Sequence, residues 1–309
     1  MAINTVRVQI NSTWVNLTRN ATTGKYEGTI AAPAITSYNV NASHYYPVTV
    51  EATDLAGNVT TENDTDATLG NNLKLFVKET TKPTISITAP ASGAYLASNT
   101  PAISFQLRDE TNGSGIKISS LAIRVDGGAA LTNTSTGVVV TTVTGGFNVT
   151  YTPQSALTDG SHTITVDIQD NDGNSAVQAA RTFKVDTVPP TLNISTPADA
   201  TTYRNAASIT LVGTTNDAVS SPVAVTVKLN SGSAETVTVD ASGNFSKALT
   251  LVEGTNTVTV TATDLAGKVS TVTRTIILDT VAPVVSSITI SPNPINVGQS
   301  YTITVEVSD

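Results

Sequence analysis

Apolar and polar residues alternate along most of the chain in short runs, and turn-forming residues separate one run from the next. A period of two residues turns one face of a segment toward a core and the other toward water, which is the pattern of a β-strand. Helical periodicity of useful length does not accompany these runs, so the pattern predicts an all-β chain. We expect strands at 85–89, 102–108, 120–125, 138–143, 147–151, 162–168 and 181–185, and again at 192–196, 208–214, 223–229, 235–240, 244–249, 256–262 and 270–278.

Two internal repeats organise these strands. The first is an alternating strand that ends in an aspartate, at Asp54, Asp170 and Asp264, with a glycine three residues later. Aspartate opens a tight turn by accepting bonds from its own backbone, and glycine supplies a positive φ, so each repeat predicts a hairpin. Seven short strands in about 100 residues are typical of an immunoglobulin-like sandwich, and we expect a tandem array of such sandwiches.

The second repeat marks the domain boundaries. Each copy opens with a proline, at Pro83, Pro190 and Pro283, and then alternates. Proline cannot donate to a strand ladder, so each copy fits a first strand at a sheet edge, just after a short linker. The resulting division is a partial domain at 1–81, complete domains at 82–187 and 188–280, and a final segment at 281–309. Linkers this short predict a semi-rigid array.

The two end segments resemble complementary parts of one domain. Residues 5–10 align with 120–125 and 223–229, the third strand of a complete domain, whereas 287–290 and 301–307 resemble the first two strands. We therefore expect residues 281–309 to complete an open sandwich by strand donation, in a neighbouring chain, giving a head-to-tail ring or filament. Closure within one chain, donation to a different neighbouring protein and frayed ends are the alternatives.

Composition narrows the chemistry. Hydrophobic residues make up 39% and charged residues 13% of the 309 positions, which suits a folded, largely uncharged surface rather than disorder. The absence of cysteine excludes disulfides, zinc–thiolate sites and cysteine nucleophiles. The two histidines, His44 and His162, have no paired acid near them in the sequence, so we expect no enzyme. A net charge of −8 argues against nucleic acid as a partner.

Membrane and export signals are also weak. The chain contains no apolar run long enough to span a bilayer, so we expect no membrane insertion. The first residues show neither a charged segment nor an apolar one, and we expect no signal peptide.

Calcium is the one metal that the sequence supports. The loop that contains Asp170, Asp172 and Asn174 is the densest cluster of oxygen ligands, and calcium takes six to eight oxygens. The linker residues Asp186 and Asp279 lie where a fold of this type brings a linker close to such a loop. The candidate ligand set is therefore Asp170, Asp172, Asn174 and Asp186. The same residues also suit an ordinary hairpin turn, and that alternative stays open.

Several motifs resemble those of bacterial immunoglobulin-like repeats. The resemblance covers the whole chain and is carried by the linkers at 186–190 and 279–283, the steps at 159–162 and 253–256, and the turns at 54–57 and 264–267. Such repeats occur in large bacterial surface proteins and in tail proteins of phages and prophages. The stretch at 6–11, Trp14 and the stretch at 23–27 are similar to tail-associated proteins of prophages in Gram-positive gut bacteria.

The resemblance implies a structural protein of a phage virion or appendage, located on the virion or otherwise outside the cell. Its partners would be further copies of itself or a neighbouring virion protein, with a host surface glycan or protein as an additional partner. The alternative is the stalk of a bacterial surface adhesin, which would require an export signal and a wall anchor. An accessory region of a secreted carbohydrate enzyme is a third interpretation, with the same requirement.

Overall fold

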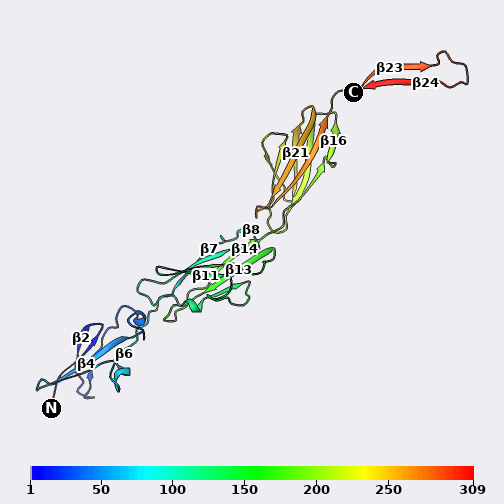
Figure 1. Ribbon diagram of the computed structural model, residues 1–309. Helices are drawn as coiled ribbons and strands as arrows, with labels where there is room; N and C mark the ends of the chain where they lie inside the picture. The colour runs from blue at the N-terminus through cyan, green and yellow to red at the C-terminus, as the bar shows by residue number, and fades with distance from the viewer. Residues whose placement is uncertain (1) are drawn as a thin grey trace. The chain divides into compact units, whose positions relative to one another are not determined.

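The computed structural model describes residues 2–309 and consists mainly of β-strands (Figure 1). Its helices are short 3₁₀ turns, namely η1 (Ser37–Asn39), η2 (Gly70–Asn72) and η3 (Ile118–Ser120). None of the helices in the described residues is long and apolar enough to cross a membrane. The all-β prediction is confirmed. Contacts divide the chain into two compact units: residues 2–94 with Asn99–Lys184, and Tyr95–Ser98 with Val185–Asp309.

The first domain is built around one sheet, with the strand order β3-β2-β1-β4-β5 and with β6 also paired to β4. The strands are β1 (Ile3–Ile10), β2 (Thr13–Arg19), β3 (Tyr26–Glu27), β4 (Tyr46–Asp54), β5 (Val59–Glu62) and β6 (Lys74–Leu75). β1 contains the expected strand at 5–10.

One face of this sheet is apolar because the strand register aligns its branched residues. Val6 lies opposite Leu17 and Ala52, and Val8 lies opposite Val15 and Val50. We call this surface the first-domain face; it consists of Val6, Val8, Ile10, Val15, Leu17, Val48, Val50 and Ala52. Val6 and Val8 are buried, and the other six residues remain partly exposed.

The second domain is a sandwich of two sheets, with the orders β10-β13-β14-β8 and β11-β12-β9-β7. All seven strands expected in this stretch are present, and the two-residue β8 is additional. Alternate residues of β9, namely Ile103, Phe105 and Leu107, are at most 1% exposed and form the core with residues of β13 such as Ile164. The strands are β7 (Thr84–Ala89), β8 (Tyr95–Leu96), β9 (Ile103–Arg108), β10 (Ala122–Val125), β11 (Val138–Val143), β12 (Gly146–Tyr151), β13 (Gly160–Asp167) and β14 (Ala179–Val185).

The third domain repeats this arrangement, with the sheets β15-β17-β20 and β16-β22-β21-β18-β19. Its seven expected strands are present, and β16 is additional because it pairs in parallel with the distant β22. One apolar core, which includes Leu211, Val225, Val258 and Ile276, fills the space between the sheets. The strands are β15 (Thr191–Thr196), β16 (Thr201–Arg204), β17 (Ser208–Asn216), β18 (Ala224–Leu229), β19 (Glu235–Val237), β20 (Asn244–Thr250), β21 (Gly254–Thr263) and β22 (Val269–Leu278).

The last two strands, β23 (Val284–Ser291) and β24 (Thr302–Ser308), pair with each other in a two-stranded sheet. The register places Ile288 opposite Val305 and Ile290 opposite Ile303, so apolar residues gather on one side. We call this surface the hairpin face; it consists of Val285, Ile288, Ile290, Ile303, Val305 and Val307, which are between 46% and 63% exposed. The hairpin therefore presents to solvent the kind of side chains that the complete domains bury.

Candidate metal centre

The Asp170 loop is a tight turn after β13, and Asp170 itself is fully buried. One of its carboxylate oxygens accepts bonds from the N–H groups of Gly173 and Asn174 at 2.7 and 2.8 Å. The other oxygen accepts a bond from the Asn174 side chain at 2.8 Å. Gly173 has a φ of +96°, a backbone conformation that favours glycine. These bonds are those of a hairpin turn, so the turn interpretation accounts for part of this loop.

Asp172 and Asn174 connect the loop to the first domain and to the linker that follows it. The Asp172 carboxylate accepts a bond from the Thr36 hydroxyl and another from the N–H of Glu79, the latter at 3.1 Å. The Asn174 side chain also donates to the Glu79 carbonyl at 3.2 Å. Both predicted ligands therefore hold the junction between the first and second domains by direct hydrogen bonds.

A carboxylate cluster lies beside these bonds. Glu79 in the linker, Asp109 after β9 and Asp170 after β13 each place one oxygen within 4.8 Å of the others; we call this cluster the first acidic junction. Glu79 accepts a bond from the N–H of Ser114, and Asp109 accepts one from the N–H of Gly115 at 2.7 Å. The other side-chain oxygen of Glu79 and that of Asp109 are buried and accept no hydrogen bond.

The electrostatics of the first acidic junction disfavour three negative charges. Burial raises the pKa of Glu79 above its ordinary 4.5, and hydrogen bonding with Glu110 adds to the rise. Burial also raises the pKa of Asp109 above 3.8; the N–H of Gly115 opposes this rise, and the charges of Glu79 and Asp170 add to it. A carboxyl group that is buried beside other carboxylates favours its neutral form unless a cation compensates the negative charges.

A second cluster lies at the start of the third domain and is more deeply buried. Asp186 in the linker, Asp217 after β17 and Asp264 after β21 also lie with one oxygen each within 4.8 Å of the others; we call this cluster the second acidic junction. The exposed fractions are 1%, 9% and 6% respectively. One oxygen of Asp264 accepts the N–H of Lys268 at 2.8 Å, while the other is buried without a hydrogen-bond partner.

Local backbone donors satisfy part of the second acidic junction. Asp217 accepts bonds from the N–H groups of Ser220 and Val219 at 2.7 and 2.8 Å. Burial alone would raise the pKa of Asp217, but these donors outweigh it and hold that pKa below 3.8. Asp186 accepts a bond from the Ser220 hydroxyl and one from the N–H of Val188, the latter at 3.1 Å. The short 217–220 loop thereby ties the linker to the third domain.

The two clusters share one construction rule, which differs from the predicted ligand set. Each combines a linker acid, an acid directly after the second long strand of a domain and the aspartate of the repeated hairpin turn. The linker acid that joins Asp170 is Glu79, whereas Asp186 joins Asp264. Asp170 and Asp186 thus each belong to an acidic cluster within their own unit. Asp172 and Asn174 lie beside the first cluster and contact Glu79.

Four members of the clusters lie outside the predicted ligand set: Glu79, Asp109, Asp217 and Asp264. A signal was present in the repeat, because an aspartate recurs directly after the second strand at Asp109, Asp217 and Asp309. The turn aspartate Asp54 has the same local motif as Asp264, yet it is partly exposed and binds the amide groups of Ala56 and Asn58.

His162 has an acidic partner that comes from a distant part of the sequence. Its Nδ1 lies 2.7 Å from the Asp126 carboxylate, and its Nε2 lies 2.7 Å from the carbonyl oxygen of Thr158. Asp126 is far away in the sequence, so local inspection could not reveal the pair. Both ring nitrogens are engaged by acceptors, which leaves neither available to a substrate. The equivalent position in the third domain is Asn256, which bonds the backbone at Val252.

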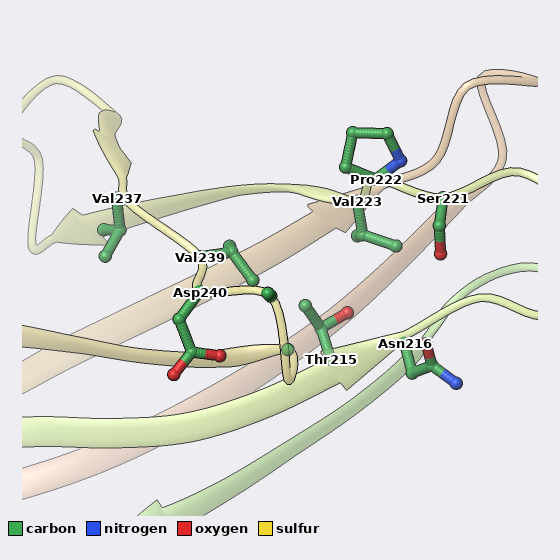
Figure 2. Close-up of a pocket in the computed structure, with 10 residues that line it drawn as sticks. Thr215, Asn216, Ser221, Pro222, Val223, Val237, Val239 and Asp240 are labelled. Carbon is green, nitrogen blue, oxygen red and sulfur yellow. The ribbon is translucent and has the colours of Figure 1, made fainter.

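A pocket of about 410 Å³ opens at one end of the third domain (Figure 2). Thr215 and Asn216 at the end of β17 line it together with the apolar side chains of Val223, Val237 and Val239. Asp240, the one charged residue of this lining, already accepts bonds from the N–H groups of Ser242 and Asn244. The pocket thus adds no carboxylate to the neighbouring second acidic junction.

Comparisons with known proteins agree with the architecture. Residues 97–187 match the family described as "Bacterial Ig-like domain", and residues 190–280 match "Glucodextranase, domain B". No curated protein matches the chain. The topology and the two family matches support a protein of immunoglobulin-like repeats. Tandem domains of this kind are typical of structural and adhesin-like proteins, and they are typically not catalytic.

Three solved structures illustrate the similarity. The fibronectin(III)-like modules of CbhA from Clostridium thermocellum align at 14% identity over 63% of this chain and 94% of that chain, with a TM-score of 0.39. Sidekick-1 immunoglobulin domains 1–5 align at 10% identity over 99% and 60%, with a TM-score of 0.36. A 1.5-MDa bacterial ice-binding adhesin aligns at 19% identity over 89% and 86%, with a TM-score of 0.30. All three scores are low, so the fold assignment rests on the topology and the family matches.

Proposed function

We propose that the chain is a non-enzymatic structural protein, a spacer of tandem immunoglobulin-like domains in a phage virion or tail appendage. The observation that carries this function is the hydrogen-bonded junction between the first two domains. Besides the bonds from Asp172 and Asn174, the Asn39 side chain donates to the Gly113 carbonyl at 2.8 Å. A junction bonded on several sides resists bending, which a spacer requires and a flexible tether lacks.

The virion assignment draws on the resemblance of the first 27 residues to tail-associated proteins of prophages. The net charge of −8 is unsuited to packaged nucleic acid and leaves further copies, neighbouring virion proteins or a host surface glycan or protein as partners. Ordered domains of this kind, placed on the virion, would hold other components at a fixed spacing.

Assembly proceeds by strand complementation in this proposal. The first-domain face is partly exposed, and the hairpin face is about half exposed in all six of its residues. Both surfaces are apolar and consist mostly of β-branched side chains, which pack well across sheets. The hairpin of one copy covers the first-domain face of the next, as a strand pair covers the opposite sheet in each complete domain.

Immunogold electron microscopy tests the virion assignment. Antibodies against the purified chain are applied to phage particles induced from the source bacterium and, separately, to sections of uninduced cells. Gold on the tails or appendages of the particles is the expected result. Gold on the walls of uninduced cells, with none on particles, would overturn the virion assignment.

That second result would support the alternative function, the stalk of a surface adhesin. Its supporting observation is that a cluster with a linker acid recurs at the start of both complete domains, because a stalk is built from domains that repeat one design. An export signal and a wall anchor would then be expected in the gene.

A further inference from the structure

We propose that each acidic junction is a calcium site, one between the first and second domains and one at the start of the third. The ligands are Glu79, Asp109 and Asp170 in the first acidic junction, and Asp186, Asp217 and Asp264 in the second. This inference goes beyond the proposed function, since neither a virion spacer nor an adhesin stalk requires a metal.

Uncompensated charge is the first argument. The three carboxylates of the second acidic junction are each at least nine-tenths buried and lie within 4.8 Å of one another. Placing like charges in a site of low dielectric is costly unless an opposite charge lies beside them. None of the four ion pairs within residues 2–309 includes a member of either junction. Backbone N–H groups and the Ser220 hydroxyl are the donors found there, and they carry no full charge.

Unpartnered oxygens are the second, independent argument. Asp264 is only 6% exposed, and its second carboxylate oxygen accepts no hydrogen bond. In the first acidic junction, Glu79 and Asp109 are only partly buried as residues, but each has one buried oxygen that accepts no hydrogen bond. Buried polar atoms in folded proteins are nearly always bonded, and an exception calls for an unseen partner. Each junction therefore contains acceptor atoms for which a cation is the natural partner.

The ligand type selects the cation. Both junctions offer carboxylate oxygens, and neither contains histidine or cysteine, the ligands that favour zinc. Magnesium requires a tight octahedron, retains several waters and rarely binds a cage of three protein carboxylates. Calcium accepts six to eight oxygens at longer distances and tolerates carboxylates that bind through one or two atoms. Three carboxylates with room for carbonyl or water oxygens suit calcium best.

The repetition of the site supports the same conclusion. The second and third domains differ in the length and sequence of the loop after their second strand, yet both place an aspartate at its first position. Both also meet an acid from the preceding linker.

Calcium titration of the full chain tests the proposal directly. Protein stripped with a chelator is titrated with calcium chloride, and in parallel with magnesium chloride, by isothermal calorimetry. The expected result is two calcium ions per chain and at least tenfold weaker binding of magnesium. Absence of binding heat together with identical melting curves in calcium and in chelator would overturn the proposal. Equal affinity for magnesium would overturn the assignment to calcium.

Matched variants locate the two sites. Asp264→Asn and Asp109→Asn should each reduce the stoichiometry from two to one, because an amide keeps the local turn bond but loses the charge. The control is Asp54→Asn, which alters the same turn motif outside either cluster and should leave two sites. Loss of a site in the control, or two intact sites in both test variants, would contradict the assignment. Circular dichroism verifies that each variant is folded. If a variant fails to fold, the number of calcium ions bound by the wild type still tests the proposal.

Discussion

At the residue scale, the pair formed by His162 and Asp126 gives the second domain a pH-dependent stability. Both acceptors of the ring are satisfied at once only when both nitrogens carry a proton. Burial alone lowers the pKa of His162, but the bonds to Asp126 and Thr158 and the charge of Asp126 raise it above 6.5. Burial alone would raise the pKa of Asp126, and the bonds from His162 and Thr163 hold it below 3.8.

The second domain should therefore lose stability as the solution becomes alkaline. A histidine whose pKa is raised on folding stabilises the fold fully below its unfolded pKa, near 6.5, and loses that contribution as the pH rises through the folded value. We expect the free energy of unfolding of this domain to fall between about pH 6 and about pH 9, by an amount that the exposure of Asp126 moderates. Scanning calorimetry of the full chain at the two pH values measures it.

The third domain supplies the control for this measurement. Asn256 occupies the equivalent position and does not titrate, so His162→Asn should flatten the pH dependence of the second domain. An equally steep dependence in the His162→Asn variant would assign the effect to other groups.

Residue patterns predicted the candidate site only in part, and the reason is distance along the chain. Asp170 was identifiable because its turn is local and dense in oxygen atoms. Glu79 and Asp109 come from a linker and from a different strand end, and only the folded sandwich places them beside Asp170. The same holds for Asp217, whose loop meets the Asp186 linker through Ser220.

At the element scale, the strands were predictable wherever a two-residue period is visible within one segment. β9 and β13 alternate strictly between core and solvent, so both were found. β8 and β16 are short strands defined by pairing with β14 and β22, far along the chain. No local period distinguishes such strands from loop, and both were missed for that reason.

Assembly through the β23–β24 hairpin can be tested by substituting residues on the two opposite faces of β24. Val305 belongs to the hairpin face, whereas the neighbouring Thr304 points to the other side. We expect Val305→Asp to abolish concentration-dependent association, because a charge would enter an apolar contact. Sedimentation velocity over a range of concentrations measures the association.

Thr304→Asp is the matched control, with the same charge one residue away and no expected effect. If wild type and both variants all sediment as monomers at every concentration, strand complementation between copies is wrong. If both variants associate as wild type does, the hairpin face is not the contact.

At the scale of the whole molecule, the linkers are the parts of the chain that we expect to respond to calcium, because each acidic junction includes a linker acid. The domain cores are apolar and shielded, with Ile103 and Leu211 fully buried. The linker acids Glu79 and Asp186, by contrast, take part in sites that calcium would complete. Calcium should consequently change the exposure of the linkers while leaving the sandwiches as they are.

Trypsin offers a direct measurement at the first linker. Lys78 is exposed and precedes Glu79, so its peptide bond becomes a cleavage site when the linker detaches. Calcium at 100 times its dissociation constant should slow this cleavage by about 100-fold relative to chelator, because the cleavage rate follows the fraction of molecules whose linker is detached. Mass spectrometry of the fragments gives the rate at Lys78.

The Asp109→Asn variant should be cleaved at Lys78 equally fast with and without calcium. Cleavage of the wild type at one rate in both conditions would show that the metal does not secure this joint.

Each acidic junction combines two acids of a domain with one acid of the linker in front of it. The segment that contains a whole junction therefore begins a few residues before the domain itself. A gene that gains or loses one whole repeat by recombination would carry a linker acid, a strand-end acid and a turn aspartate together. The new joint would be complete at once, whichever neighbours it acquires. The number of domains could then vary among descendants without any compensating substitution, because each added domain would bring its own acidic junction.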